Sequence, residues 1–132
     1  MSHLSTSKTA IKCLKALGQA CEELGVELIV DAKQKGVRAR GYNSTTHVGD
    51  AVVKLKGPYD IAFNRQDDGS YAGVTDWYAG HVAKEVGQDF KGLTDVYTAH
   101  RLTNKAKAKG LFVQRSLNRS GGIRLTVTGG KL

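Results

Sequence analysis

The residues with the clearest chemistry in this sequence are the cations that follow Asp95, because none of the 12 acidic residues lies beyond that position. The chain carries a formal net charge of +8, and its first 95 residues are neutral. The excess charge therefore belongs to one C-terminal stretch, which contains Arg101, Lys105, Lys107, Lys109, Arg115, Arg119, Arg124 and Lys131. Such a field attracts polyanions, and phosphate backbones are the commonest of these.

Two groups of cations are candidates for phosphate binding. The first group consists of Arg101, Lys105, Lys109, Arg115, Arg119 and Arg124. Its first three members recur every four residues, which predicts one side of a helix. The second group, with no acid inside it, consists of Lys33, Lys35, Arg38 and Arg40. The sequence leaves open whether the groups share a face, and the alternative is a solvated basic surface with some other role.

Histidine, cysteine and carboxylate patterns do not predict an active site. The four histidines are scattered, and none lies at ligand spacing from another histidine or a cysteine, so we expect no metal. Cys13 and Cys21 lie on the apolar stripe of a predicted helix, where a thiol is normally inert. Asp67 and Asp68 belong to a predicted hairpin turn. We therefore predict a protein that is not an enzyme and has no cofactor.

One small group of side chains keeps a pocket open as a hypothesis. Tyr97 and His100 are three residues apart on a predicted helix and could project into one pocket. Trp77 could stack on a base there. The interpretation that we favour is structural: Tyr97 packs on the sheet, His100 lies at its boundary, and Trp77 anchors the core. An enzyme that uses Tyr97, His100 and Asp76 is the least favoured alternative.

Hydrophobic periodicity predicts the order of the elements. Apolar residues three and four apart predict a helix over residues 11–24, with Gly25 as its stop and Ser5 or Ser7 as its cap. Strands are expected at 26–30, 37–42, 51–56, 59–63 and 70–75, and a leading strand at 2–6. Helical spacing then returns at Val82, Val86 and Phe90, with a second helix over 93–109. Two closing strands, 111–117 and 123–128, flank a polar loop.

This order, roughly (β)αββββααββ, is typical of an α+β fold. We expect a mainly antiparallel sheet covered by two or three helices on one face, in a single domain over residues 1–132. No apolar run approaches the roughly 20 residues of a membrane span. The first ten residues are polar and lack the apolar region of a signal peptide. We therefore predict a soluble, cytoplasmic protein that does not associate with membranes.

Several short motifs carry a resemblance to a known family. The chain opens Met1-Ser2-His3-Leu4-Ser5, and it contains Tyr59-Asp60-Ile61-Ala62-Phe63, Gly69-Ser70-Tyr71, Asp76-Trp77 and Gly122-Ile123-Arg124-Leu125. It resembles a small family of conserved hypothetical chloroplast reading frames, found in algal plastids, cyanobacteria and phages, whose members open Met-Ser-His-Phe-Ser. The resemblance implies the same element order and an intracellular setting, including the plastid stroma or a phage-infected host. Because the family's function is not established, it implies no site residues.

Two functions remain as hypotheses. The first is a small non-enzymatic intracellular protein that binds a nucleic acid or a phosphorylated nucleotide through its basic C-terminal face. The second is an adaptor or assembly protein that acts through protein–protein contacts or self-association, using open sheet edges and the final hairpin. Binding that weakens steeply with salt would indicate the first function.

Overall fold

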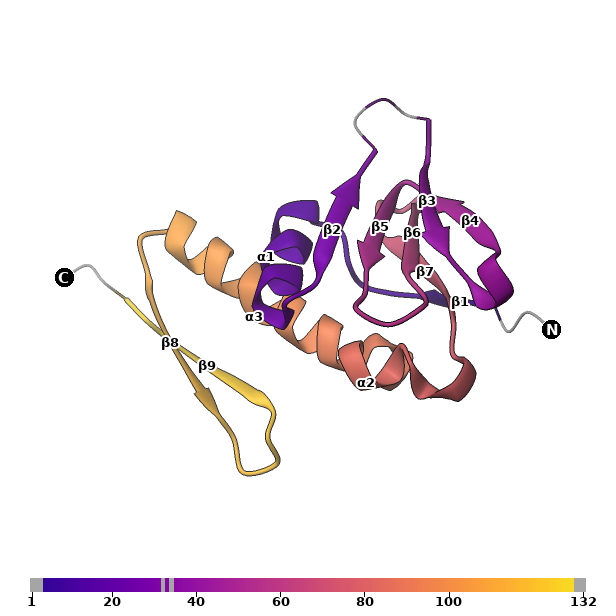
Figure 1. Cartoon of the computed structure of the whole chain (residues 1–132). Coiled ribbons are helices and arrows are strands. Elements are labelled where there is room, and N and C mark those ends of the chain that lie inside the picture. The colour runs from indigo at the N-terminus through magenta and orange to yellow at the C-terminus, as the bar shows by residue number, and fades with distance from the viewer. Residues whose placement is uncertain (1–3, 32, 34, 130–132) are drawn as a thin grey trace.

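A computed structural model of the chain describes residues 4–31, 33 and 35–129 (Figure 1). Its helices and strands, in order, are β1 (Leu4–Lys8), α1 (Leu14–Leu24), β2 (Glu27–Val30), β3 (Val37–Arg40), β4 (Thr46–Gly49), β5 (Ala51–Lys54), β6 (Ile61–Arg65), β7 (Tyr71–Asp76), α2 (Ala83–Val86), α3 (Lys91–Ala108), β8 (Phe112–Leu117) and β9 (Ile123–Thr128). The predicted α+β class and element order are confirmed.

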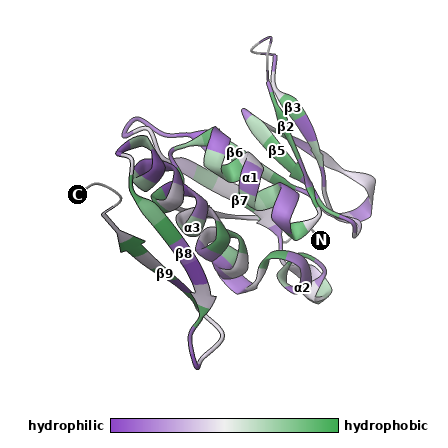
Figure 2. Cartoon of the chain, turned by 90° about the vertical axis from the view of Figure 1, so that its left-hand side faces the viewer, coloured by the Kyte–Doolittle hydropathy of each residue, from purple (hydrophilic) through white to green (hydrophobic). Residues whose placement is uncertain are grey.

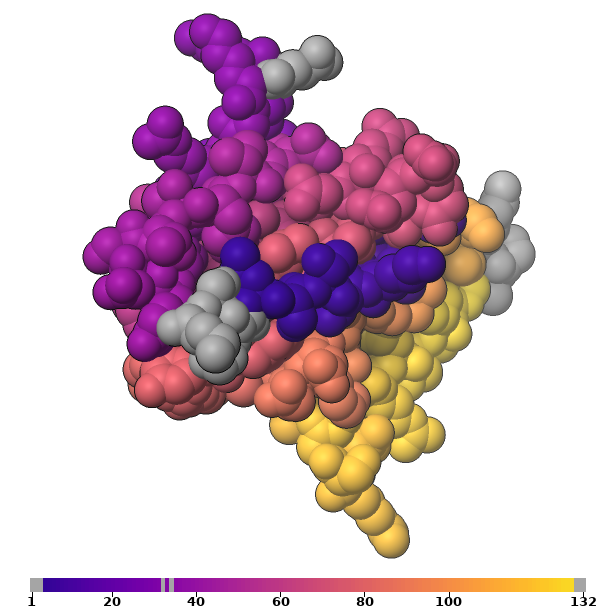
Figure 3. Space-filling model, turned by 90° about the vertical axis from the view of Figure 1, so that its right-hand side faces the viewer, coloured from indigo at the N-terminus to yellow at the C-terminus, as the bar shows by residue number. Residues whose placement is uncertain are grey.

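The main sheet is antiparallel and five-stranded, with the strand order β1-β7-β6-β5-β2. Helices α1 and α3 pack against each other and cover one face of this sheet (Figure 2). The β3–β4 hairpin covers part of the other face. Strand β1 forms one edge of the sheet and lies on the surface, where it is drawn in indigo in Figure 3.

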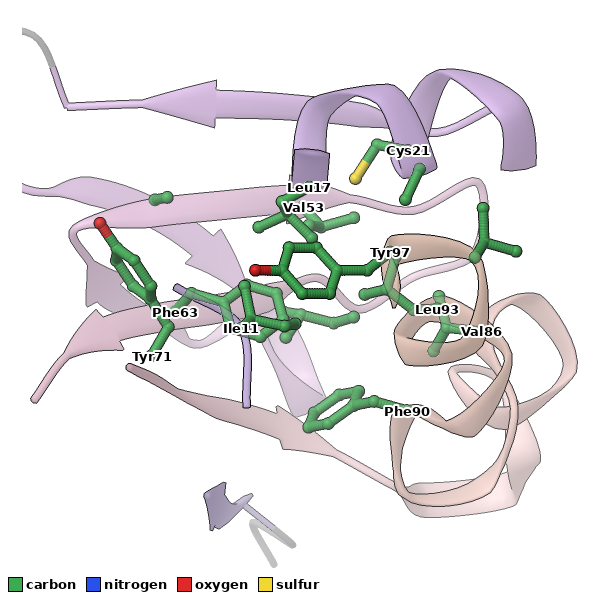
Figure 4. Packing of buried hydrophobic residues seen from close by; sticks show 14 of the residues in the cluster. Ile11, Leu17, Cys21, Val53, Phe63, Tyr71, Val86, Phe90, Leu93 and Tyr97 are labelled. Carbon is green, nitrogen blue, oxygen red and sulfur yellow. The ribbon is translucent and has the colours of Figure 1, made fainter. Parts of the chain in front are cut away.

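The larger core lies between the sheet and the helices, and Figure 4 shows its centre. Phe63 from β6 and Phe90, which precedes α3, are both almost fully buried, and their ring centroids are 5.8 Å apart. Leu17 of α1 and Leu93 of α3 complete the centre without exposed surface. Burial of each such side chain contributes about 1.5–3 kcal/mol. These contacts hold α3 in place, and α3 in turn positions the C-terminal hairpin.

Successive side chains of β5 point to opposite faces of the sheet, so this strand contributes to two hydrophobic cores. Ala51 and Val53 face the helices, whereas Val52 packs with Ala39 and Ala62 under the β3–β4 hairpin. Strand β4 was not predicted, because its short sequence shows no apolar alternation. It approaches the sheet so closely that a Cβ atom added at Gly49 would lie 2.9 Å from the Ala62 Cβ atom.

Several predicted boundaries are wrong for identifiable reasons. Helix α1 starts at Leu14 rather than residue 11, and neither Ser5 nor Ser7 caps it, since both lie in β1. The Tyr97 hydroxyl instead holds the segment just before α1, because it accepts hydrogen bonds from the backbone N–H groups of Lys12 and Cys13. The leading strand runs from Leu4 to Lys8, and residues 2 and 3 of its prediction lie outside the described residues.

The helix expected around Val82 is also shorter than its periodicity suggested. Helix α2 covers only Ala83–Val86, because Gly87, Asp89 and Phe90 all adopt positive φ angles and end it. The predicted stop of α1 is confirmed, since Gly25 has a φ of 75° and its N–H bonds back into the helix. The positive φ angles of Gly87, Asp89 and Phe90 set the sharp turn that leads from α2 into α3.

Candidate nucleic-acid interface

Strands β8 and β9 form a two-stranded ribbon that is separate from the main sheet and contacts α3. Figure 2 shows this ribbon beside α3, and Figure 3 shows its yellow tip extending below the body of the molecule. An isolated hairpin of this size is only marginally stable in water, so its attachment matters. The first group of predicted cations lies on this ribbon and on the second half of α3.

The register of the ribbon gives it two distinct faces. The inner face, toward α3, pairs Val113 with Val127, Arg115 with Leu125, and Leu117 with Ile123. The outer face pairs Phe112 with Thr128, Gln114 with Thr126, and Ser116 with Arg124. All six outer residues are exposed. Because side chains alternate along a strand, Ile123 and Leu125 of the inner face lie toward α3 while the six outer side chains face away from it.

Arg115 fastens the inner face to the helical layer. Its two terminal nitrogens each donate a hydrogen bond of 2.8 Å to one carboxylate oxygen of Glu23, at the end of α1. His100 Nε2 also lies 2.8 Å from Glu23 Oε1. The hydrogen bond from Arg115 is the main cause that lowers the pKa of Glu23 below its usual value. Arg115, predicted as a phosphate ligand, is thus occupied by a carboxylate of its own chain.

Other cations of the C-terminal stretch, Lys107 included, carry no such partner among the described residues. Within the described part of the chain, no ion pair involves Lys105, Lys107, Lys109, Arg119 or Arg124, and all of these are exposed. Lys107 and Lys109 lie where α3 ends and the ribbon begins, whereas Arg119 lies in the loop at the ribbon's tip. The unpaired charges therefore flank the outer face at both ends, with Arg124 on the face itself.

Arg101 and Lys105 continue the helical line of Thr94 and Thr98 on α3. These threonines border a small cavity of about 260 Å³ together with Lys8 at the end of β1, and Thr98 also borders the groove beside the ribbon. The adjacent line through Asp95, Ala99 and Leu102 faces that groove. Arg101 is half-buried there. These cations extend the basic surface around the helix rather than across the ribbon.

The second predicted group does not join the first. Lys33 and Lys35 lie in the β2–β3 loop, at the end of the molecule opposite the ribbon tip (Figure 1). Their backbone N–H groups donate to the carboxylate of Asp31, which shapes this loop. Arg38 follows on β3 and is exposed. The two basic groups therefore form separate surfaces.

Arg40, the last member of the second group, belongs to a buried network. Its Nε and Nη2 atoms donate to Asp60, whose side chain has no exposed surface, and its Nη2 also donates to the Leu55 carbonyl. Burial strongly opposes the charge of Asp60, yet hydrogen bonds from Arg40 and the Leu55 N–H lower its pKa overall. This guanidinium therefore supports the fold.

The three residues of the hypothetical pocket serve separate contacts. Tyr97 is buried in the core (Figure 4), and its hydroxyl accepts hydrogen bonds from the two backbone N–H groups just before α1. His100 contacts Glu23 near the other end of α1. Trp77 packs against Phe90, with ring centroids 4.9 Å apart. The structure thus places them at three different points of the core and its boundary.

A groove of about 510 Å³ separates α3 from the tip half of the ribbon. Its apolar floor contains Ala99, Leu102, Ile123 and Leu125, and its rim contains polar residues from both elements. Leu102 is 48% exposed, and Leu117 at the edge of the ribbon is 73% exposed. Ile123, which pairs with Leu117, nevertheless packs against the main core, so the ribbon is attached through β9 beside this groove.

Sequence reasoning missed the two carboxylates, Glu23 and Asp60, that pair with Arg115 and Arg40. It also missed the uncharged side chains of the outer face, Gln114, Ser116 and Thr126. The alternation of the last two predicted strands places these three residues on the same face of the hairpin as Arg124, and that placement could have identified them. No such local pattern connects Glu23 to Arg115, which is 92 positions away.

The elements define a class of protein: an α+β domain that carries an appended basic β-ribbon. The family described as "Protein of unknown function (DUF1257)" matches residues 20–126, and the chain belongs to this family. Comparisons with curated proteins and with solved structures found no match. Membership of a family of unknown function agrees with the resemblance noted in the sequence. Among the described helices, none combines the length and apolar character needed to span a membrane.

Proposed function

We propose that this protein binds nucleic acid, without catalysing a reaction, through the ribbon and the adjacent end of α3. The observation that carries the proposal is the set of exposed cations along this unit that have no carboxylate partner among the described residues. The stretch from Val96 to Leu132 contains no acid, so nothing within it opposes the attraction of phosphates.

Location remains part of this proposal. The resemblance to plastid, cyanobacterial and phage proteins supports a cytoplasmic protein, or one in the plastid stroma or in the cytoplasm of a phage-infected host. Nucleic acid is present in each of these compartments. A small phosphorylated nucleotide is a variation of the same ligand chemistry, and the salt dependence of binding separates the two.

Fluorescence anisotropy of labelled single-stranded RNA, single-stranded DNA and duplex DNA, titrated across a salt series, tests the proposal. Micromolar or tighter binding at about 0.15 M salt is expected, because each neutralised phosphate contributes about −0.7 to −0.9 to the log–log slope. The double variant Arg119→Glu/Arg124→Glu should lose most of this affinity. Stoichiometric nucleotide binding with weak salt dependence would favour the variation instead.

A matched control comes from the other end of the molecule. Lys33→Glu/Lys35→Glu changes the net charge by the same amount but alters a surface separate from the ribbon. It should reduce affinity much less than the ribbon variant. Equal losses would contradict a localised interface, and no binding at about 0.05 M salt would contradict the proposed function itself.

A second candidate, protein association, is favoured by the apolar side chains that the ribbon unit leaves exposed. Phe112 is 67% exposed, and Leu117 and Val127 are 73% and 47% exposed. Sedimentation of the protein at moderate salt would reveal a discrete oligomer if self-association were its role. Leu117→Ser should abolish such an oligomer, whereas a monomer with salt-sensitive nucleic-acid binding supports the first proposal.

A further inference from the structure

The outer face of the ribbon has a composition that its fold alone does not explain. Its three cross-strand pairs, Phe112–Thr128, Gln114–Thr126 and Ser116–Arg124, form a continuous exposed strip. Among its six residues are one cation and no acid, and four of the others carry uncharged polar groups. Its amide, hydroxyl and guanidinium groups are also the donors and acceptors that read base edges.

Resting on the proposed function, we propose that this outer face enters the major groove of B-form duplex DNA. The major groove, about 12 Å wide, admits a two-stranded β-ribbon. Each strand of the ribbon has six residues. At about 3.3 Å per residue the strip is therefore roughly 20 Å long, the length of about six base pairs.

The side chains of the strip match the hydrogen-bonding pattern of that groove. Arg124 can donate two hydrogen bonds to guanine O6 and N7, and Gln114 can pair with adenine N6 and N7. Ser116 and Thr126 suit either kind of base, and Phe112 offers an apolar contact to a thymine methyl group. Duplex RNA fits poorly, because its A-form major groove is too deep and narrow for side chains to read.

The flanking cations occupy suitable positions for the phosphates that border the groove. Lys107 and Lys109 precede the base of the ribbon, and Arg119 lies at its tip, so the strip has positive charge at both ends. Phosphate contacts of this kind fix the register of a protein on the duplex, whereas base contacts specify sequence. The ribbon unit thus combines both kinds of contact in one element.

The ribbon also stands where a duplex can reach it. Figure 2 looks onto the ribbon, and no described segment lies in front of β8 and β9. Its opposite face is fixed to the helical layer by Ile123, Leu125 and the Arg115–Glu23 ion pair. The orientation of the ribbon's outer side chains is therefore fixed before DNA binds.

Four labelled nucleic acids test the inference, with the full-length chain: a duplex DNA, the duplex RNA of the same sequence, its single-stranded DNA, and the duplex DNA with glucosylated hydroxymethylcytosine. Glucose fills the major groove and leaves the phosphates in place. We expect duplex DNA to bind at least 10-fold more tightly than the RNA or the glucosylated DNA. Netropsin, which occupies the minor groove, should not displace the protein.

Variants of the strip supply the second readout. Gln114→Ala/Thr126→Ala should weaken binding to a duplex enriched from a random-sequence pool by about 10-fold while its salt slope stays unchanged, because no charge is removed. Ser5→Ala/Thr6→Ala on the exposed edge strand β1 is the matched control and should leave affinity unchanged. Circular dichroism and the thermal midpoint report whether each variant remains folded.

Two results would overturn the inference while leaving the proposed function intact. One is equal affinity for duplex DNA, its RNA counterpart and its glucosylated form; the other is displacement by netropsin. Failure of the proposed function has a different signature, namely no binding of any of the four nucleic acids at about 0.05 M salt.

Discussion

Arginines on the main domain and on the C-terminal ribbon differ in what their charge does. Arg40 binds the fully buried Asp60 and the Leu55 carbonyl, so its charge is neutralised within the fold. Arg124 is exposed and pairs with no carboxylate in the described chain. A guanidinium whose carboxylate is supplied by its own chain supports structure, and one without such a partner is available to a ligand. Net charge alone cannot separate these two roles.

The largest expected effect is a loss of stability in the main domain. Arg40→Ala leaves the buried carboxylate of Asp60 without its counter-ion, and breaking a buried pair in this way costs about 3 kcal/mol. Urea denaturation followed by circular dichroism measures this change in the free energy of unfolding. Arg38→Ala, an exposed neighbour on the same strand, is the control and should stay within about 0.5 kcal/mol. Similar losses in both variants would contradict a structural role for Arg40.

A pH-dependent stability is the next effect, and it also belongs to the main domain. Both ring nitrogens of His47 are buried and have no hydrogen-bond partner in the described part of the chain. Burial is the main cause that lowers its pKa below the ordinary 6.5, although Asp60 and Asp76 oppose this. The unfolded chain therefore binds a proton at a higher pH than the folded one, and stability falls as the pH decreases below about 6.5.

Replacing the imidazole isolates this contribution. Unfolding free energies of the parent and of His47→Phe, measured between pH 7 and pH 5, should diverge by at most about 1.4 kcal/mol per pH unit. The variant should show the shallower decline, because it has no buried ring to protonate. If the unfolding free energies of the two proteins fell in parallel with pH, burial of His47 would not be the cause of the decline.

The third effect concerns the junction between the two regions. Arg115→Ala removes a bidentate but partly exposed ion pair with Glu23, so the free energy of unfolding should change by about 1 kcal/mol or less. The ribbon should nevertheless loosen, because this pair ties its inner face to α1. Hydrogen exchange should accelerate at the backbone amides of Val113 and Leu125 and stay unchanged in β6.

Glu23→Gln tests the same junction from the other side and should accelerate the same amides. The depressed pKa of Glu23 adds a pH test. A carboxyl group with a lowered folded-state pKa stabilises above its ordinary pKa, and that stabilisation disappears as the pH falls through the folded value. In the parent protein, the protection of these ribbon amides, measured relative to their intrinsic exchange rate, is therefore expected to fall only as the pH decreases through the folded-state pKa of Glu23. A uniform change in exchange across the chain would contradict a local role of the Arg115–Glu23 ion pair in holding the ribbon.

The helices and most strands were predictable, because their patterns depend on residues close together in the sequence. The spacing of Leu14, Leu17, Cys21 and Leu24 indicates α1, and Gly25 ends it as expected. The alternation in β5 and β6 gives the sheet its two faces. Strand β4 escaped prediction because it is fixed by the close approach of Gly49 to Ala62, a contact that depends on the assembled sheet.

The candidate site was less predictable, because it depends on partners far apart in the sequence. Charge counting located the basic stretch, but it treated Arg40, Arg115 and Arg124 as equivalent. Asp60 lies 20 positions from Arg40, and Glu23 lies 92 positions from Arg115. Only the folded chain shows which cations are already neutralised, and therefore which could contact a polyanion.

The smallest expected change in stability completes the comparison and uses the same substitution in the other region. Arg124→Ala removes an exposed guanidinium that has no partner in the described chain, so the free energy of unfolding should stay within about 0.5 kcal/mol of the parent. Its affinity for duplex DNA should fall, because the contact proposed between Arg124 and a guanine base, worth about 1–3 kcal/mol, is lost.

Measuring stability and binding on both variants turns the comparison into a reciprocal test. Arg40→Ala should lose stability but, at temperatures where it is folded, retain the affinity of the parent. Arg124→Ala should retain stability and lose affinity. An Arg124 variant that unfolds as readily as the Arg40 variant would show that the ribbon's outer face is structural. A reciprocal result would show that the two arginines divide folding and binding between them, because Arg40 has a carboxylate partner and Arg124 has none within the described chain.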